Sequence, residues 1–242
     1  MHNHFDYIIV GGGSAGCVLA NRLSNDFNAE VLLLEAGPKD RNPLIHMPAS
    51  ISRLIEHKTL NWNYTTTPQT AMNERQIPVP RGRTLGGSSS INAMVHIRGQ
   101  AQDYDEWRDM GNDGWGYSDV LPLFKYSETN HGANIDEGFH GFKGPLQIND
   151  RAYTHPLSDL FVESAEAVGL AKNNDFNGHN QLGVGRYQVA QSNGKRCSSA
   201  TAYLHPAADR PNLSVITNAK VRRILFNATR AVGVEYQVGN NV

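Results

Sequence analysis

An α/β fold built on a parallel sheet is predicted by two features near the start of the chain. The first is an apolar run at residues 5–10, which leads into a glycine-rich turn at residues 11–16. The second is an apolar run at residues 31–34, which ends in Glu35 and is separated from the turn by a stretch of helical type. A strand, a turn, a helix and a second strand in this order form a βαβ unit, and such units build parallel sheets.

The elements that follow are expected to be short and mixed in type. Ser118 is a candidate N-cap, Pro156 suits the first turn of a helix, and Gly169 is a candidate helix stop. Near the end of the chain, β-prone runs alternate with turn residues and indicate strands. The expected helices are residues 103–110, 119–127, 157–168 and 198–204, and the expected late strands are residues 213–217, 221–226 and 231–238.

The glycine-rich turn has the G-x-G-x-x-G spacing of a dinucleotide-binding fingerprint. Gly11 allows the tight turn, Gly13 lets the backbone approach a pyrophosphate, and Gly16 lets the helix pack close to the strand. Ser14 opens that helix, whose N-terminal N–H groups favour an anion. Glu35 can accept hydrogen bonds from a ribose diol. An ordinary glycine-rich turn would lack this context, so the sequence predicts dinucleotide binding without saying which dinucleotide.

Composition limits the classes of partner. The chain has 242 residues, of which 39% are hydrophobic, so it can bury a substantial core. Its 22 Lys and Arg residues nearly balance its 23 Asp and Glu residues, which gives a net charge of -1 and no indication of a nucleic-acid partner. The two cysteines, Cys17 and Cys197, do not suggest a disulfide framework, and a reducing compartment fits.

The sequence also bears on location and metal binding. A first strand that begins near residue 5 leaves no room for a signal peptide, and no apolar run approaches the roughly 20 residues that span a bilayer. We therefore expect a cytoplasmic protein with no transmembrane segment, and peripheral attachment to the inner membrane stays open. The histidines are scattered without metal-ligand spacing, so we expect no metal site.

A second glycine-rich segment, residues 81–95, bears on which dinucleotide is bound. Its Gly86-Gly87 pair lets the backbone approach a ligand where a Cβ would clash, and three serines follow. Arg81 and Arg83 would bring positive charge near a bound pyrophosphate. Composition alone fits a flexible serine-rich loop equally well.

Beside the first fingerprint, this segment resembles the signature of the glucose–methanol–choline (GMC) family of flavin oxidoreductases. The chain is most similar to the choline dehydrogenase and alcohol dehydrogenase branch, and the resemblance spans essentially all of it. Further matches lie at residues 34–37, 46–48, 139–141, 144–146, 196–198 and 202–204.

The resemblance implies a Rossmann-like FAD-binding domain with part of an α+β substrate domain, and a C-terminal portion of the family's fold is expected to be missing. The FAD-binding domain would be discontinuous and incomplete, and would comprise residues 1–40, about 80–100 and 205–242. Residues of about 41–79 and 101–204 would form a cap and a partial substrate-binding region.

The resemblance also implies which residues would contact FAD, and matches them to parts of the cofactor. Some family members attach FAD covalently through a histidine immediately before the matching asparagine. This chain has Ile91 there, which implies a noncovalent flavin. The implied contacts are Gly11, Gly13, Ser14 and Gly16 for the pyrophosphate, Glu35 and Ala36 for the ribose, Arg83, Thr84 and Gly87 toward the flavin, Asn92, Ala93, Met94 and Val95 against its ring, and Val221 near the adenine.

The family oxidises alcohols: a histidine takes the hydroxyl proton and the α-carbon passes a hydride to flavin N5. We accordingly expect a primary alcohol substrate, choline-like or aliphatic, and an electron acceptor that is either a quinone or oxygen. Both catalytic residues of the family lie in a motif beyond the range of these 242 residues. No catalytic residue is therefore expected here, and His96 and His140 are interpreted as structural or cofactor-neighbouring side chains.

Two other functions remain open from the residues alone. An NAD(P)-dependent Rossmann dehydrogenase would share the first fingerprint but would give no reason for residues 81–95. A noncatalytic flavin-binding module would fit the expected lack of a catalytic base. The flavoenzyme interpretation requires residues 81–95 to lie beside the turn at residues 11–16.

Overall fold

The computed structural model describes residues 4–239, so the outer ends of the expected cofactor segments 1–40 and 205–242 lie outside the described residues. The chain divides into two units, and each is described by itself. The first unit combines residues 1–93 with residues 195–242, and the second is residues 94–194.

The first unit is built on a three-stranded parallel sheet with the strand order β1-β2-β11. Strand β1 spans Tyr7–Val10, β2 spans Val31–Glu35 and β11 spans Leu213–Thr217. Helix α1, Ser14–Leu23, connects β1 to β2, and Tyr7 and Leu213 both pair with Val31. The predicted βαβ unit is therefore confirmed.

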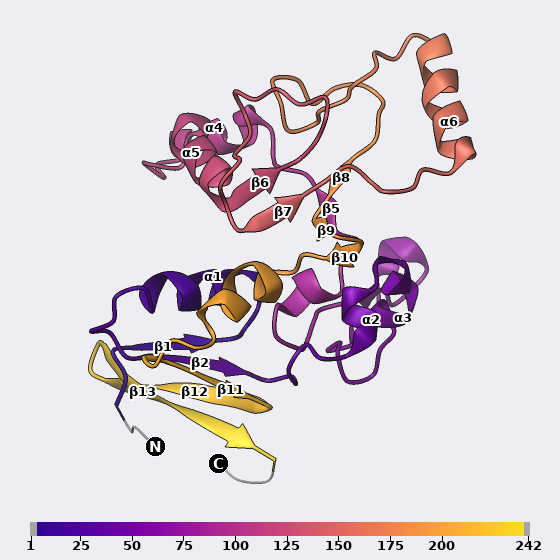
Figure 1. Cartoon of the computed structure of the whole chain (residues 1–242). Helices are drawn as coiled ribbons and strands as arrows, with labels where there is room; N and C mark the ends of the chain where they lie inside the picture. Colours follow the sequence, from indigo (N-terminus) through magenta and orange to yellow (C-terminus); the bar gives the residue numbers. More distant parts are fainter. Residues whose placement is uncertain (1–3, 240–242) are drawn as a thin grey trace. The chain divides into compact units, whose positions relative to one another are not determined.

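The central strand β2 is buried along its whole length because both faces of the sheet are covered. Helix α1 lies over one face, and an antiparallel hairpin lies under the other (Figure 1). The hairpin consists of β12, Ala219–Asn227, and β13, Arg230–Val238. Leu32 and Leu34 of β2 form a core cluster with Ala219, and partly buried hydrophobic residues of β1, β11 and the hairpin pack against it. These two layers fix the carboxyl end of β2, where Glu35 lies.

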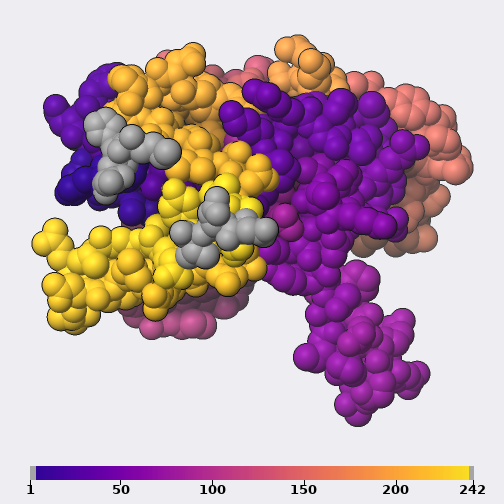
Figure 2. Space-filling model, turned by 90° about the horizontal axis from the view of Figure 1, so that it is seen from below, coloured from indigo at the N-terminus to yellow at the C-terminus, as the bar shows by residue number. Residues whose placement is uncertain are grey.

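The remainder of the first unit consists of short elements. A second core cluster joins Ile45, Leu54, Leu60 and Ile91. The residues around the antiparallel pairing of Tyr64–Thr65 with Pro78–Val79 protrude from the rest of this unit in Figure 2. The elements are α2 (Pro43–His46), η1 (Pro48–Ser50), α3 (Ile51–Ile55), β3 (Tyr64–Thr65), η2 (Thr70–Met72), β4 (Pro78–Val79), η3 (Gly87–Ser90), β10 (Lys195–Arg196), the π-helical turn η4 (Ala200–Leu204) and η5 (His205–Ala207).

The second unit combines three helices with pairs of short strands. Strand β5 pairs antiparallel with β8, and β6 pairs parallel with β7. The elements are β5 (Val95–His96), α4 (Ala101–Asp109), α5 (Tyr117–Ser127), β6 (Glu128–Asn130), β7 (Leu146–Ile148), α6 (Pro156–Ala167), β8 (Gln188–Val189) and β9 (Gln191–Ser192).

The strand predicted at residues 213–217 has the predicted ends, and the other predicted helices and late strands are found with shifted ends. Helix α5 begins before Ser118, so the expected N-cap is wrong: Gly116 occupies that position and its N–H donates to Asp119 at 3.1 Å. Helix α6 starts at the expected Pro156, and Gly169 beyond its end has a φ of 96°. Within the described part of the chain, none of the helices combines the length and apolarity needed to span a membrane.

Candidate functional site

Two glycine-rich loops of the first unit touch each other. The N–H of Gly86 donates to the carbonyl oxygen of Gly12 at 2.7 Å. Gly87 has a φ of 53°, and a Cβ there would come within 2.7 Å of the Cα of Gly13. A side chain at residue 87 would therefore force the loops apart. The requirement that residues 81–95 reach the turn at residues 11–16 is met.

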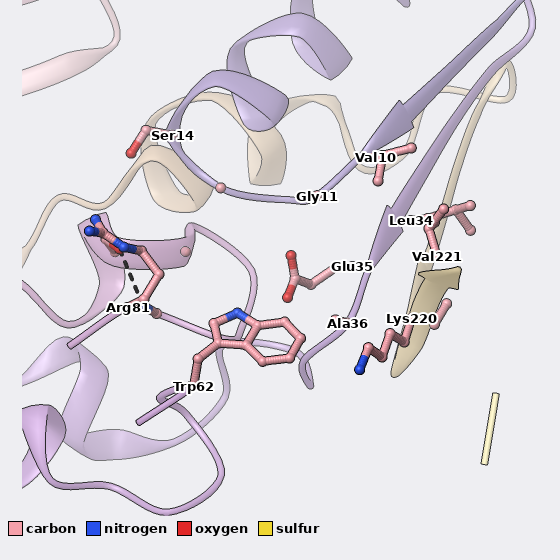
Figure 3. A pocket seen from close by; sticks show the side chains of 15 residues that line it. Val10, Gly11, Ser14, Leu34, Glu35, Ala36, Trp62, Arg81, Lys220 and Val221 are labelled. Carbon is pink, nitrogen blue, oxygen red and sulfur yellow. Dashed lines mark hydrogen bonds between the residues drawn. The ribbon is translucent and has the colours of Figure 1, made fainter. Parts of the chain in front are cut away.

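A cavity of about 480 Å³ opens where the loops meet. Figure 3 shows that the side chains of Glu35 and Trp62 point into the space between the Gly11 turn and the Arg81 segment. The residues that line the cavity are Val10, Gly11, Gly13, Ser14, Leu34, Glu35, Ala36, Trp62, Arg81, Gly82, Gly87, Ser88, Ala219, Lys220 and Val221.

The N-terminus of α1 forms one wall of this cavity. Gly13 is its N-cap and supplies no side-chain cap, and the first turn of the helix carries no acidic residue. The first N–H groups of a helix have no partner within the helix, so here they are left for a ligand. A Cβ at Gly13 would meet no atom within 4 Å, which leaves open space beside those N–H groups. This wall suits an anion.

Glu35 lies at the end of β2, and both of its carboxylate oxygens accept backbone hydrogen bonds. Oε2 accepts from the N–H of Gly12 at 2.8 Å, and Oε1 accepts from the N–H of Gly37 at 2.7 Å. Burial raises the pKa of Glu35, although these two bonds and the charge of Arg83 oppose the rise. Each carboxylate oxygen keeps a lone pair, so Glu35 can hold the glycine turn and still accept a bond from a ligand hydroxyl.

An aromatic wall with cations around it forms the opposite side. The ring of Trp62 lies 5.3 Å from the guanidinium carbon of Arg83 and 5.7 Å from the ammonium of Lys220, measured to the ring centroid. The side chain of Asn61 accepts from the N–H of Arg81 at 2.8 Å and so fixes the chain next to Trp62. The side chains of Arg81, Arg83 and Lys220 carry three positive charges around this ring, against the one carboxylate of Glu35. The charges favour an anionic ligand, and the ring of Trp62 favours one that also presents a flat ring.

The predicted contact residues fall into three groups. Half of them line the cavity: Gly11, Gly13, Ser14, Glu35, Ala36, Gly87 and Val221. Gly16, Arg83 and Thr84 are not among the lining residues: Arg83 contacts the ring of Trp62, a Cβ at Gly16 would be 1.9 Å from the oxygen of Gly11, and the hydroxyl of Thr84 donates to the carbonyl oxygen of Pro38. Asn92 and Ala93 end the loop segment in the first unit, whereas Met94 and Val95 begin the second.

Eight of the fifteen lining residues were not predicted as contacts, and Trp62 and Lys220 are the two of them that add an aromatic ring and a further cation. A lone tryptophan is more often a core residue, and a lone lysine is usually a surface residue. The signal for Lys220 was its neighbour Val221, which was predicted. Trp62 had no such neighbour, because the bond from its N–H to the carbonyl oxygen of Arg81 at 2.8 Å appears only in the folded chain.

The second unit contains a buried polar network around Glu128. This carboxylate lies 2.8 Å from His96, Arg98 and His140, and the other ring nitrogen of His140 lies 2.9 Å from Asp175. Burial alone would lower the pKa of His140, but its bonds to Asp175 and Glu128 outweigh burial and raise the pKa to about 9. Both nitrogens of His140 are engaged, which fits the structural interpretation of this side chain.

Between residues 4 and 239, no group of three or more His, Cys, Asp or Glu side chains could hold a metal ion.

Comparison with known proteins gives the family. The family described as GMC oxidoreductase matches residues 5–242. The chain belongs to this family. It is 52% identical to an alcohol dehydrogenase (acceptor) of Pseudomonas putida, with 96% of the chain covered, and 46% identical to the mitochondrial choline dehydrogenase of Mus musculus, with 97% covered. It spans 42% and 40% of the lengths of these relatives.

Solved structures give the same fold. The pyridoxine 4-oxidase from Mesorbium loti is 35% identical and superposes with a TM-score of 0.90, over 96% of this chain and 46% of its own. An FAD-dependent oxidoreductase from Chaetomium thermophilum is 32% identical with a TM-score of 0.92, over 99% of this chain and 43% of its own. The expected fold class is therefore confirmed.

Proposed function

We propose that this chain binds FAD for the oxidation of a primary alcohol, choline-like or aliphatic, to an aldehyde. The observation that carries the proposal is the contact between the two glycine loops, with the 2.7 Å bond from Gly86 to Gly12 beside a cavity that both loops line. A Rossmann dehydrogenase would need only the first loop. The names of the relatives, an alcohol dehydrogenase and choline dehydrogenases, support this substrate class.

The residues present fit FAD by their chemistry. The open N-terminus of α1 beside Gly13 suits the diphosphate, and Glu35 has lone pairs for the hydroxyls of a ribose. Val221 and the ring of Trp62 give the same cavity apolar surface for a base. We propose that the cofactor domain comprises residues 1–40, about 80–100 and 205–242, with the remainder forming the cap and substrate region.

The flavin end of the cofactor is proposed to lie along residues 83–95. Arg83, Thr84 and Gly87 would follow its length, and residues 92–95 would lie against its ring. Ile91 is buried in an apolar cluster and offers no atom for a covalent bond to the flavin, so we propose noncovalent attachment.

FAD, when bound, supplies the acceptor for the hydride that leaves the alcohol carbon. This chain's own residues bind and orient that cofactor. The hydroxyl proton needs a base, and His140 cannot serve because both of its nitrogens are engaged with carboxylates. We therefore assign no catalytic residue within these 242 residues. The final electron acceptor is proposed to be a quinone or oxygen, and the protein to be cytoplasmic or peripheral on the inner membrane.

Purification of the chain followed by flavin spectroscopy tests the proposal. FAD added to the protein should shift its visible absorbance and raise its melting temperature, whereas NAD and NADP should do neither. Precipitation with acid should leave all the flavin in the supernatant, because no covalent bond holds it. Binding of NAD(P) without FAD would favour the alternative dehydrogenase.

A further inference from the structure

The first unit contains a buried arginine pressed against the second glycine loop. Arg196 ends β10 and is 2% exposed. Its Nη1 donates to the carbonyl oxygen of Ser89 at 3.1 Å, and to the carbonyl oxygen and Oδ1 of Asn92 at 2.8 Å each. Its Nε donates to the carbonyl oxygen of Ile45 at 2.8 Å. One guanidinium therefore links the loop to α2.

The charge of Arg196 has no counterion among the described residues. None of the ion pairs there includes it, and its Nη2 has no hydrogen-bond partner. By contrast, the other nearly buried guanidinium, that of Arg98, lies 2.8 Å from Glu128. Burial lowers the pKa of Arg196 to about 10, with no carboxylate to oppose the shift. A buried cation held only by carbonyl dipoles is costly, which indicates that the position requires a charge.

The bonds to Arg196 set the direction of a peptide group that is expected to face the cofactor. In a trans peptide, the C=O of one residue and the N–H of the next point in opposite directions. The carbonyl of Asn92 points at Arg196, so the N–H of Ala93 points away from it. Ala93 is exposed and is one of the residues implied to contact the flavin ring.

We propose that Arg196 is a positioning residue for the bound cofactor: it turns the N–H of Ala93 toward the flavin, and its unpaired charge behind that peptide favours the flavin's reduced, more negative state. This inference rests on the proposed binding of FAD. Two measurable properties follow, which are the affinity for FAD and the midpoint potential of the bound flavin.

The test compares the wild-type chain with Arg196→Gln and Arg196→Lys. Arg196→Gln removes the charge-assisted bonds that hold the Ser89 and Asn92 carbonyls, so the loop is no longer held for the cofactor and FAD binding should weaken by roughly tenfold or more. It should also lower the midpoint potential of the FAD that binds at saturation. Arg196→Lys keeps the charge but not the fork of donors, so it should weaken binding while the potential stays near the wild-type value. Arg53→Gln removes an exposed arginine from the same unit and should change neither property.

The outcomes separate the two proposals. If the wild-type chain does not bind FAD, the proposed function fails. If it binds FAD and Arg196→Gln retains affinity within about twofold and an unchanged potential, the role of Arg196 is overturned. If circular dichroism shows that Arg196→Gln does not fold, Arg196→Lys decides the question. The proposal is contradicted if Arg196→Lys binds FAD as tightly as wild type, or if the midpoint potential of its bound flavin falls.

Discussion

Gly13 and Gly16 differ in what a side chain would meet at each position. A Cβ at Gly16 would lie 1.9 Å from the carbonyl oxygen of Gly11, whereas a Cβ at Gly13 would meet nothing within 4 Å. The fold itself therefore requires glycine at residue 16. At residue 13 the protein has room for a methyl group, and glycine is needed only if a ligand occupies that room.

Gly13→Ala should separate binding from folding. We expect its unfolding free energy to stay within about 1 kcal/mol of wild type, because the methyl group meets no protein atom. Its FAD affinity should fall by roughly tenfold or more, because the methyl group would project into the cavity beside the α1 N-terminus. Denaturant unfolding and FAD titration measure the two quantities. Gly16→Ala is the matched variant and should instead lose about 3 kcal/mol or more of stability. Undiminished FAD binding by a folded Gly13→Ala variant would place the diphosphate elsewhere.

Glu35→Gln tests the carboxylate that closes the first turn. Both of its oxygens accept backbone N–H groups, and an amide nitrogen placed at either position would leave the N–H of Gly12 or Gly37 without an acceptor. We expect a loss of about 1–3 kcal/mol in the free energy of unfolding, together with weaker FAD binding. Glu56→Gln, an exposed change in the same unit, is the control. If FAD stabilised Glu35→Gln as much as wild type, the carboxylate would not contact the ribose.

At this scale the sequence predicted the residues whose roles depend on nearby positions. The spacing of Gly11, Gly13 and Gly16 is enough to predict a turn. Glu35 could be predicted because it stands at the end of the second apolar run. Trp62 joins the cavity through pairings with Arg81 and Lys220, which are distant in sequence, so no local pattern could predict it. Arg196 is likewise visible as a buried unpaired cation only after β10 meets the loop.

At the scale of elements, prediction succeeded where burial is simplest. Strand β2 is buried on every residue, and its continuous apolar run, placed after the glycine turn and a helical stretch, predicted a strand. Short elements were harder, because their ends depend on particular bonds: α5 begins early because Asp119 caps Gly116. The network that joins β5, β6 and the loops at His140 and Asp175 was not predicted, since four separate segments supply its charges.

The network should make the second unit's stability depend on pH in a defined window. The pKa of His140 rises from 6.5 to about 9 on folding, so its contribution is complete below pH 6.5 and is lost as pH rises through 9. Burial alone would raise the pKa of Glu128, but bonds from His140 and His96 lower it below its ordinary value of 4.5, so its contribution is lost as pH falls below that value. The network therefore stabilises most between about pH 4.5 and 6.5.

His140→Gln checks this window. The difference in unfolding free energy between wild type and variant should shrink by about 2–3 kcal/mol between pH 6.5 and 9. Denaturant titrations across this range measure it, and His131→Gln, which removes an exposed histidine from the same unit, is the matched control. A difference that stays constant across the range would show that His140 is not charged in the folded protein.

At the scale of the whole molecule, the first unit is assembled from the two ends of the chain. Strand β11 and the β12–β13 hairpin come from the last part, yet they complete the sheet begun by β1 and β2. The family resemblance predicted this discontinuity, which no local sequence pattern contains.

Large apolar side chains remain exposed in the first unit, among them Val10 at 52% and Phe226 at 61%.

The 242-residue chain, expressed as it stands, should bind FAD weakly and oxidise no alcohol. It holds both glycine loops, so FAD should raise its melting temperature, but gel filtration should strip the flavin, because the chain spans only 42% of the Pseudomonas putida relative and has fewer contacts to offer. Turnover needs an unprotonated base at the hydroxyl, and the buried His140 is held protonated between two carboxylates. The measurement is dye-coupled oxidation of choline and of aliphatic primary alcohols by the FAD-saturated chain, with free FAD as background. Activity above that background would mean that a base lies within these residues, and its persistence in His140→Gln would direct the search to another side chain.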